Sequence, residues 1–177
     1  MFLIKLNLGC GNDYVEGYVN IDRDPKYCTN GVDLIADIRC LPYQANSVGE
    51  IRVEGCLEHL SYRDVMPTLI HWFCLLKPNG KIVIETPNLM RVLKDVTKEW
   101  TNINSHAYET LYGGQRNSTE YHTGLWDIHH LVMYMEVAGF VDVTSETPTK
   151  NLESGEDWNI RVIGTKFHEW SFPGLSK

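Results

Sequence analysis

The chain has 177 residues, of which 43% are hydrophobic and 22% are charged, so it can bury the core of one globular domain. Its formal net charge of −7 argues against nucleic-acid binding, because contacts to phosphate need clustered Lys and Arg. No apolar run approaches the ~20 residues that a membrane span requires. We therefore expect a single domain over residues 1–177 whose partners are small molecules, with neither nucleic acid nor membrane among them.

Cysteine and histidine spacing predicts the compartment and the metal content. The five cysteines are widely spaced, with no CxxC pair and no secretory signal ahead of them, which is typical of reduced thiols in a cytoplasmic protein. A zinc site favours closely spaced Cys or His, and the adjacent pair His129 and His130 would diverge on a helix. The sequence therefore predicts no metal site.

Strand-like segments alternate with helical ones along the chain. Seven segments have strand composition, namely residues 3–8, 18–22, 32–38, 50–55, 81–86, 141–146 and 159–167. A helix is predicted to begin at Ser61 and end at Lys77, with an inward face made of Met66, Leu69, Ile70, Phe73 and Leu76. A second is predicted from Asp127 to Gly139, with an inward face made of Ile128, Leu131, Val132, Met135 and Ala138. This order favours an α/β fold with a mainly parallel sheet.

Two connections are too short to carry the usual crossover helix. Only about ten residues separate the first strand from the second, and the second from the third. Strand residues 3–8 also alternate apolar with polar side chains, whereas a strand covered on both faces is nearly all apolar. We therefore expect the first three strands to be bare on one face, or covered there by residues 88–124 or by the second subunit of a homodimer.

Residues 88–124 form a long excursion between a strand and the next sheet helix. They contain one amphipathic stretch, a further helical turn over residues 105–112, and the polar, aromatic segment YGGQRNSTEYHTG. Excursions of this length are usually functional, so we expect an insert that acts as a lid or specificity element.

The glycine loop after the first strand points to a nucleoside site. Gly9 and Gly11 let the backbone approach a ligand at the carboxyl edge of the sheet. Asp22 ends the second strand, where a carboxylate can accept both ribose hydroxyls, and Asp37 repeats the arrangement on the third. A dinucleotide site would have a third glycine where Tyr14 stands and a full helix after the loop, so a nucleoside without phosphates fits better.

Five motifs in this order resemble a known family. The segments LNLGCGN, NID, LIADI, VEGCLEHL and LLKPNGKIVIETPN look like the successive motifs of class I S-adenosylmethionine-dependent methyltransferases. Their spacing is most similar to a compact subgroup associated with glycan and surface-polysaccharide biosynthesis, in which the first crossover helix is reduced. The resemblance implies a Rossmann-like sheet of seven strands whose last strand is reversed.

The resemblance also implies a cofactor, S-adenosylmethionine, and a set of residues that bind it. They are Gly9, Cys10 and Gly11 beside the methionine part, Asp22 on the ribose, Asp37 with the Ile38 backbone at the adenine, and Glu54 with Gly55 at the methyl-donating end.

Residues on the acceptor side are indicated less directly. Glu58 and His59 follow the fourth strand, where they would either contact an acceptor or cap the helix that begins at Ser61. Gln115, Tyr121 and His122 would either contact substrate and complete the pocket or pack the insert on the core. Our hypothesis is that His59 or His122 is the general base for a hydroxyl on a sugar or similar small molecule; a carboxylate or amine acceptor would need no base.

The sequence thus predicts methyl transfer from S-adenosylmethionine to a small-molecule acceptor, with a sugar hydroxyl as the expected class. Three alternatives stay open at this point. They are an adenosyl-cofactor-binding protein without catalysis, an NAD-type oxidoreductase, and an aminopropyltransferase that uses decarboxylated S-adenosylmethionine.

Overall fold

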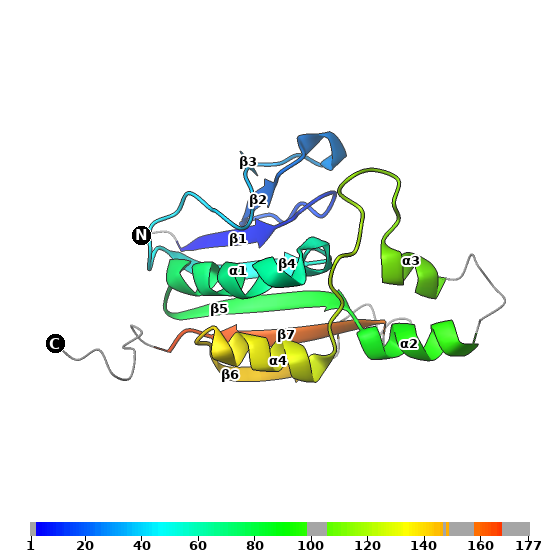
Figure 1. The fold of residues 1–177 in the computed structure, drawn as a ribbon. Coiled ribbons are helices and arrows are strands. Elements are labelled where there is room, and N and C mark those ends of the chain that lie inside the picture. The colour runs from blue at the N-terminus through cyan, green and yellow to red at the C-terminus, as the bar shows by residue number, and fades with distance from the viewer. Residues whose placement is uncertain (1–2, 99–105, 147, 149–157, 168–177) are drawn as a thin grey trace.

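A computed structural model describes residues 3–98, 106–146, 148 and 158–167 of the chain (Figure 1). Its sheet has seven strands in the order β3-β2-β1-β4-β5-β7-β6. They are β1 (Ile4–Leu8), β2 (Val19–Asp22), β3 (Leu34–Ile35), β4 (Val48–Glu54), β5 (Leu76–Pro87), β6 (Val141–Glu146) and β7 (Asn159–Thr165). The five neighbouring strands β3, β2, β1, β4 and β5 pair in parallel. Strand β7 runs antiparallel to both β5 and β6. The predicted fold class and the reversed last strand are confirmed.

The helices lie on one face of the sheet or beyond its carboxyl edge. They are α1 (Tyr62–Leu75), α2 (Leu89–Lys98), α3 (His106–Tyr112) and α4 (Ile128–Val137), with the 3-10 turns η1 (Pro25–Tyr27) and η2 (Leu57–His59). In Figure 1, α1 and α4 lie over the same face, while α2 and α3 stand past the end of β5. None of the described helices has the length and apolar character needed to cross a bilayer.

Helix α1 begins where the sequence predicts, but its buried face is shifted by about one residue position from the predicted face. Ser61 is its N-cap, and the Ser61 hydroxyl accepts a hydrogen bond from the Arg63 amide at 3.4 Å. The buried stripe runs through Val65, Thr68, Leu69, Trp72 and Phe73, and Ile70 is 46% exposed, so the predicted inward place of Ile70 was wrong. Apolar Met66 and Ile70 adjoin the true stripe on one side, so the sequence pattern favours a shifted face, whereas the fully buried Trp72 lies within the true stripe.

Helix α4 matches its prediction closely. The Asp127 carboxylate accepts hydrogen bonds from the amides of His129 and His130 at 3.0 and 3.1 Å, which caps the first turn. Leu131 and Met135 are fully buried against the sheet. Gly139 ends the helix at a φ of +108°, the left-handed conformation that favours glycine.

Polar side chains take the place of the two missing crossover helices. Residues 9–18 contain no helix, and residues 23–33 contain only η1, as expected. Asn7 donates to the Asn20 side chain at 2.9 Å, and the same Asn20 oxygen accepts the Val15 amide at 2.8 Å. The Asn20 amide donates to the Asp33 carboxylate at 2.8 Å. This network, which we call the asparagine network (Asn7, Val15, Asn20 and Asp33), holds the two short connections against the strands.

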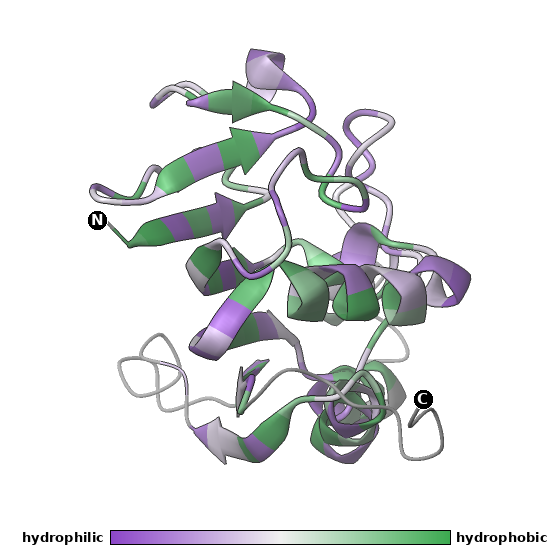
Figure 2. Ribbon diagram, turned by 90° about the vertical axis from the view of Figure 1, so that its left-hand side faces the viewer, coloured by the Kyte–Doolittle hydropathy of each residue, from purple (hydrophilic) through white to green (hydrophobic). Residues whose placement is uncertain are grey.

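The sheet face opposite α1 and α4 is charged. Lys5 pairs with Glu50 at 3.0 Å, and Arg161 pairs with Glu85 at 2.6 Å. Figure 2 shows the matching alternation of hydrophilic and hydrophobic bands along the strands. Within the described ranges no helix packs on this face, which agrees with the expected bare side of the first three strands. Whether a second subunit covers it stays a prediction.

The packing of Trp72 gives a testable prediction. Its indole N–H donates to the Ile38 carbonyl at 2.9 Å from a fully buried position, so Trp72→Ala leaves a cavity and an unpaired carbonyl. We expect Trp72→Ala to lower the free energy of unfolding by about 3 to 5 kcal/mol in urea denaturation. The control Ile70→Ala, on the exposed side of the same helix, should cost less than about 1 kcal/mol. Equal losses would contradict the assigned helix face.

Candidate functional site

A pocket opens at the carboxyl ends of the parallel strands, where open α/β sheets bind their ligands. Its cavity volume is about 210 Å³, and the cavity is partly open to solvent. Its lining residues are Gly9, Gly11, Asp22, Arg23, Tyr27, Asp37, Ile38, Arg39, Gly55, Cys56, His59, Leu60, Asn117, Thr119 and Glu120.

The glycine loop forms the floor of this pocket. Gly9 has a φ of +65°, and a Cβ there would lie 2.2 Å from the Cys56 sulfur, so no larger residue fits. Gly11 has a φ of +45°, and a Cβ there would meet no atom within 4 Å. The backbone at Gly11 is therefore open to a ligand on the pocket side.

Asp22 is held in place by the loop on either side of it. One carboxylate oxygen accepts the Gly11 amide at 3.0 Å, and the other accepts the Asp24 amide at 3.0 Å. A carboxylate has about four lone-pair sites, so each oxygen retains a lone pair for a ligand. The side chain is oriented before any ligand arrives.

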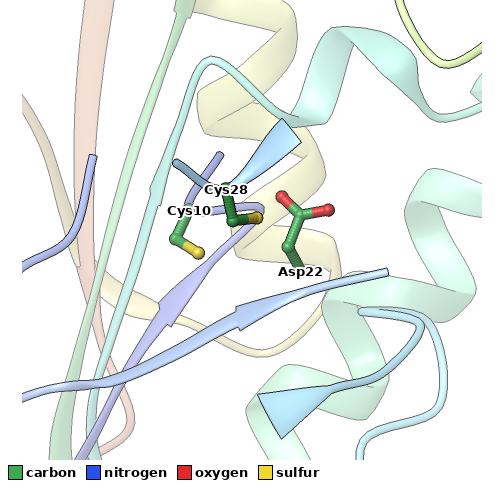
Figure 3. Close-up of side chains that lie close together, drawn as sticks. All are labelled: Cys10, Asp22 and Cys28. Atoms are coloured by element: carbon green, nitrogen blue, oxygen red, sulfur yellow. The ribbon is translucent and has the colours of Figure 1, made fainter. Parts of the chain in front are cut away.

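Cys10 is not among the residues that line the pocket; it holds the glycine loop in place. Its side chain is buried, and Figure 3 shows it beside Cys28 and Asp22. Burial, together with the neighbouring Cys28 and Asp22, raises the pKa of Cys10 to about 12, so the thiol stays protonated at neutral pH. The Cys10 amide donates to the Ile21 carbonyl at 3.0 Å, which fixes the loop to β2.

The third strand end is closed by an ion pair that the sequence did not predict. Asp37 lines the pocket, but its carboxylate pairs with Arg39 at 2.6 Å. Hydrogen bonds from the Arg39 side chain and backbone lower the pKa of Asp37. Arg39 also reaches Asp64 at 3.1 Å. The Ile38 carbonyl accepts a hydrogen bond from the Trp72 indole N–H, so a ligand would contact Ile38 through a group other than this carbonyl.

Glu54 and Gly55, the two residues expected at the methyl-donating end, lie in different places at the end of β4. Gly55 lines the pocket with a φ of +62°. Glu54 is not among the lining residues, because successive residues of a strand point to opposite faces, and its carboxylate pairs with Arg52 on the charged face. The structure therefore places Glu54 outside the pocket, against the expectation.

Glu58 is a buried carboxyl behind the pocket wall. It is only 3% exposed, and desolvation raises its pKa to about 7. One of its carboxyl oxygens accepts the Thr86 hydroxyl at 3.1 Å. Its backbone carbonyl accepts the amides of Thr123 and Gly124 at 2.8 and 3.1 Å, which ties the end of the insert to η2. Since Ser61 caps α1, Glu58 and His59 do not cap that helix.

His59 and His122, which were predicted as candidate bases from separate segments, are in contact in the structure. His59 lines the pocket, and the His122 ring lies edge-on to it with 4.8 Å between centroids. Their Nδ1 atoms lie 3.1 Å from the Tyr121 carbonyl and 2.5 Å from the Thr110 carbonyl. Burial lowers both pKa values, which favours neutral imidazoles.

Other residues of the insert line the pocket instead of those predicted. Gln115 and Tyr121 are not lining residues; the Gln115 side chain donates to the Tyr112 carbonyl at 3.3 Å. The insert reaches the pocket through Asn117, Thr119 and Glu120. The Asn117 side chain accepts the Thr119 amide at 2.8 Å, a local turn that Asn and Ser favour. The NST triplet was a usable signal for that turn.

Arg23, Tyr27 and Cys56 also line the pocket without having been predicted. Arg23 and Tyr27 follow Asp22 in a connection that normally holds a helix, and Cys56 begins the turn after β4. Their proximity to nominated residues was the only signal in the sequence.

Comparison with known proteins gives a consistent picture of the fold. No protein-family model matches the chain, and no curated protein matches it. Among solved structures, a SAM-dependent methyltransferase from Archaeoglobus fulgidus aligns with a TM-score of 0.65 at 15% identity over 93% of this chain and 86% of that one. One from Methanosarcina mazei aligns with a TM-score of 0.66 at 14% identity over 96% and 95%. A possible histamine N-methyltransferase from Thermotoga maritima aligns with a TM-score of 0.63 at 15% identity over 92% and 82%.

These neighbours all have the S-adenosylmethionine-dependent methyltransferase fold, and the identities are low enough that the likeness concerns the fold alone. The chain therefore has the Rossmann-like fold of these methyltransferases, with a pocket at the carboxyl edge of its sheet.

The close approach of Gly9 to Cys56 gives a prediction that needs no ligand. Gly9→Ala should lower the free energy of unfolding by more than Gly17→Ala does. Both positions have positive φ, but a Cβ at Gly17 meets nothing within 4 Å. The backbone strain of about 1 to 2 kcal/mol is shared, and the clash with Cys56 should add about 1 to 3 kcal/mol.

Urea denaturation of the two variants measures the difference, and adding Cys56→Gly to Gly9→Ala should recover part of it. Equal stability of the two single variants would contradict the described contact.

Proposed function

We propose that this protein transfers a methyl group from S-adenosylmethionine to a small-molecule acceptor, with a sugar hydroxyl as the acceptor class. One observation carries the proposal. A single pocket joins the glycine loop, the oriented Asp22 carboxylate and His59 at adjoining strand ends. The methyltransferase fold of the neighbours supports the same choice of cofactor.

The residues present fit an adenosyl cofactor. The open space beside Gly11 leaves room for the methionine part, and Asp22 offers carboxylate lone pairs to the ribose hydroxyls. Asp37 and Ile38 stand at the adenine end, and Gly55 with Cys56 at the methyl end. Glu54 has no place in this scheme because it lies outside the pocket.

An NAD-type oxidoreductase fits less well. A pyrophosphate is normally held at the N-terminus of a helix that follows the glycine loop. Residues 9–18 form no helix, and Tyr14, where a third glycine would stand, directs its hydroxyl to Asp33 at 3.2 Å. The loop therefore offers backbone to a nucleoside but no helix end to a diphosphate.

The protein's own task in methyl transfer is alignment. The bound cofactor supplies an activated methyl group on a sulfonium. The chain must hold the acceptor atom about 3 to 3.5 Å from that methyl carbon and keep water out. Gly55, Cys56 and Leu60 form the wall on that side, and His59 is the polar group there. The Nδ1–H of His59 donates a hydrogen bond to the Tyr121 carbonyl. The lone pair on Nε2 can therefore either accept a proton from a hydroxyl or bind a cation.

The insert supplies the features that favour a sugar. Asn117, Thr119 and Glu120 place amide, hydroxyl and carboxylate groups on one wall of the pocket, a set suited to a polyhydroxylated acceptor. We propose that residues 88–124 act as the lid, since this wall belongs to the insert and would close over a bound acceptor.

Titration calorimetry with S-adenosylhomocysteine tests the proposal. Asp22→Ala should weaken binding about 10- to 100-fold, because a hydrogen bond to a charged group contributes about 1.5 to 3 kcal/mol. Asp13→Ala is the matched control, since Asp13 is 61% exposed and pairs with Arg52 outside the pocket. NAD should give no heat.

Absence of S-adenosylhomocysteine binding in folded protein, or equal binding by both variants, would contradict the proposal. Binding of the cofactor without transfer of a labelled methyl group to any sugar, amine or carboxylate acceptor would favour the alternative of a cofactor-binding protein.

A further inference from the structure

Three metal-ligating side chains converge behind the acceptor wall of the pocket. Glu58, His59 and His122 each offer one ligand atom, and these atoms all lie within 4.8 Å of one another. We call them the Glu-His-His cluster. It joins η2 to the far end of the insert, and the amides of Thr123 and Gly124 on the Glu58 carbonyl hold that junction together.

Both imidazoles are oriented as metal ligands usually are. A backbone carbonyl can only accept, so the carbonyls of Tyr121 and Thr110 assign the proton to Nδ1 of His59 and of His122. Each Nε2 is then left with a lone pair. A ligating histidine commonly donates its other ring N–H to a backbone carbonyl in this way, which fixes the tautomer and the ring plane.

Glu58 is a buried carboxylate that lacks a cationic partner in the described part of the chain. Its Oε2 accepts the Thr86 hydroxyl, while its Oε1 lies 3.8 Å from where a Cβ on Gly55 would be, at the edge of the pocket. The carboxylate of Glu85, which is of the same sign, adds to the burial that raises the pKa of Glu58. An unpaired carboxylate is costly to bury, and a coordinated cation would remove that cost.

We propose that Glu58, His59 and His122 bind one divalent first-row transition metal ion, such as Mn²⁺, Fe²⁺, Co²⁺ or Zn²⁺. Two imidazoles with one carboxylate suit these ions, whereas Mg²⁺ and Ca²⁺ prefer all-oxygen ligands. Three protein ligands leave coordination positions open, and His59 places them beside the pocket. This proposal departs from the sequence prediction of no metal site, which considered only ligands close together in sequence.

A consequence for catalysis rests on the proposed function. An open position of the ion would hold the acceptor hydroxyl oxygen and ease loss of its proton to water. An oxygen lone pair then forms the new O–CH₃ bond as the S–CH₃ bond breaks, and that electron pair stays on sulfur as S-adenosylhomocysteine. In this arrangement the histidines are ligands, and neither is the general base.

A second cluster, made of Cys10, Asp22 and Cys28, has similar spacing (Figure 3). There two buried thiols would both have to lose protons next to a carboxylate that the cofactor site uses. It therefore serves as the rival site in the experiment, with Cys28→Ser as its probe.

The test is titration of untagged, chelator-treated protein with Co²⁺, followed by visible absorption and calorimetry. We expect one equivalent to bind. Glu58→Gln and His122→Gln should each weaken binding beyond the ~10- to 100-fold loss typical of residues that only orient a ligand. His129→Gln, at an exposed histidine, and Cys28→Ser should bind Co²⁺ like the wild type.

Proton NMR of the wild-type Co²⁺ complex adds a readout that needs no variant. Two exchangeable, strongly shifted imidazole N–H signals are expected, one from each Nδ1–H. The proposal is overturned by no stoichiometric binding, by binding that Glu58→Gln and His122→Gln leave intact, or by binding that Cys28→Ser abolishes.

Titrating the same samples with S-adenosylhomocysteine separates the two proposals. Cofactor binding without Co²⁺ binding would overturn the metal site alone. Co²⁺ binding without cofactor binding would leave the metal site standing and overturn the proposed function.

Discussion

The asparagine network is the constraint on which the cofactor side of the pocket depends. Most parallel strands are joined by a helix that packs the connection onto the sheet. Here buried Asn7 and Asn20 hold the connections from within, and Asp33 stays ionised because hydrogen bonds from the Asn20 backbone and side chain lower its pKa. Gly11 and Asp22 lie in the segments that this network holds, and the Gly11 amide donates to the Asp22 carboxylate, so the ligand site is built on the same short connections.

The charged face of the sheet follows from the same loss. Without helices to cover it, the face carries ion pairs: Lys5 with Glu50, which are both partly exposed, and Arg161 with the buried Glu85. The helices α1 and α4 carry the core on the other face. Glu58, behind the pocket wall, is a buried carboxyl with no cationic partner among the described residues, and this favours a cation there.

Much of the architecture could be predicted from the sequence because it rests on local signals. Strand alternation, the helix caps Ser61 and Asp127, and the short connections all depend on residues that are close together in the sequence. The buried face of α1 could not be chosen, since apolar Met66 and Ile70 adjoin the true stripe. The Asp37 ion pair and the meeting of His59 with His122 join distant segments, so only the folded insert brings them together.

The central claim is that the pocket at the carboxyl edge holds an adenosyl cofactor with its methyl end toward His59. A crystal structure grown with S-adenosylhomocysteine tests it most directly. The account predicts the ribose hydroxyls on Asp22, the homocysteine beside Gly9 and Gly11, and the sulfur facing Gly55 and His59. Density for the ligand elsewhere on the protein, or a ribose that leaves Asp22 uncontacted, would contradict it.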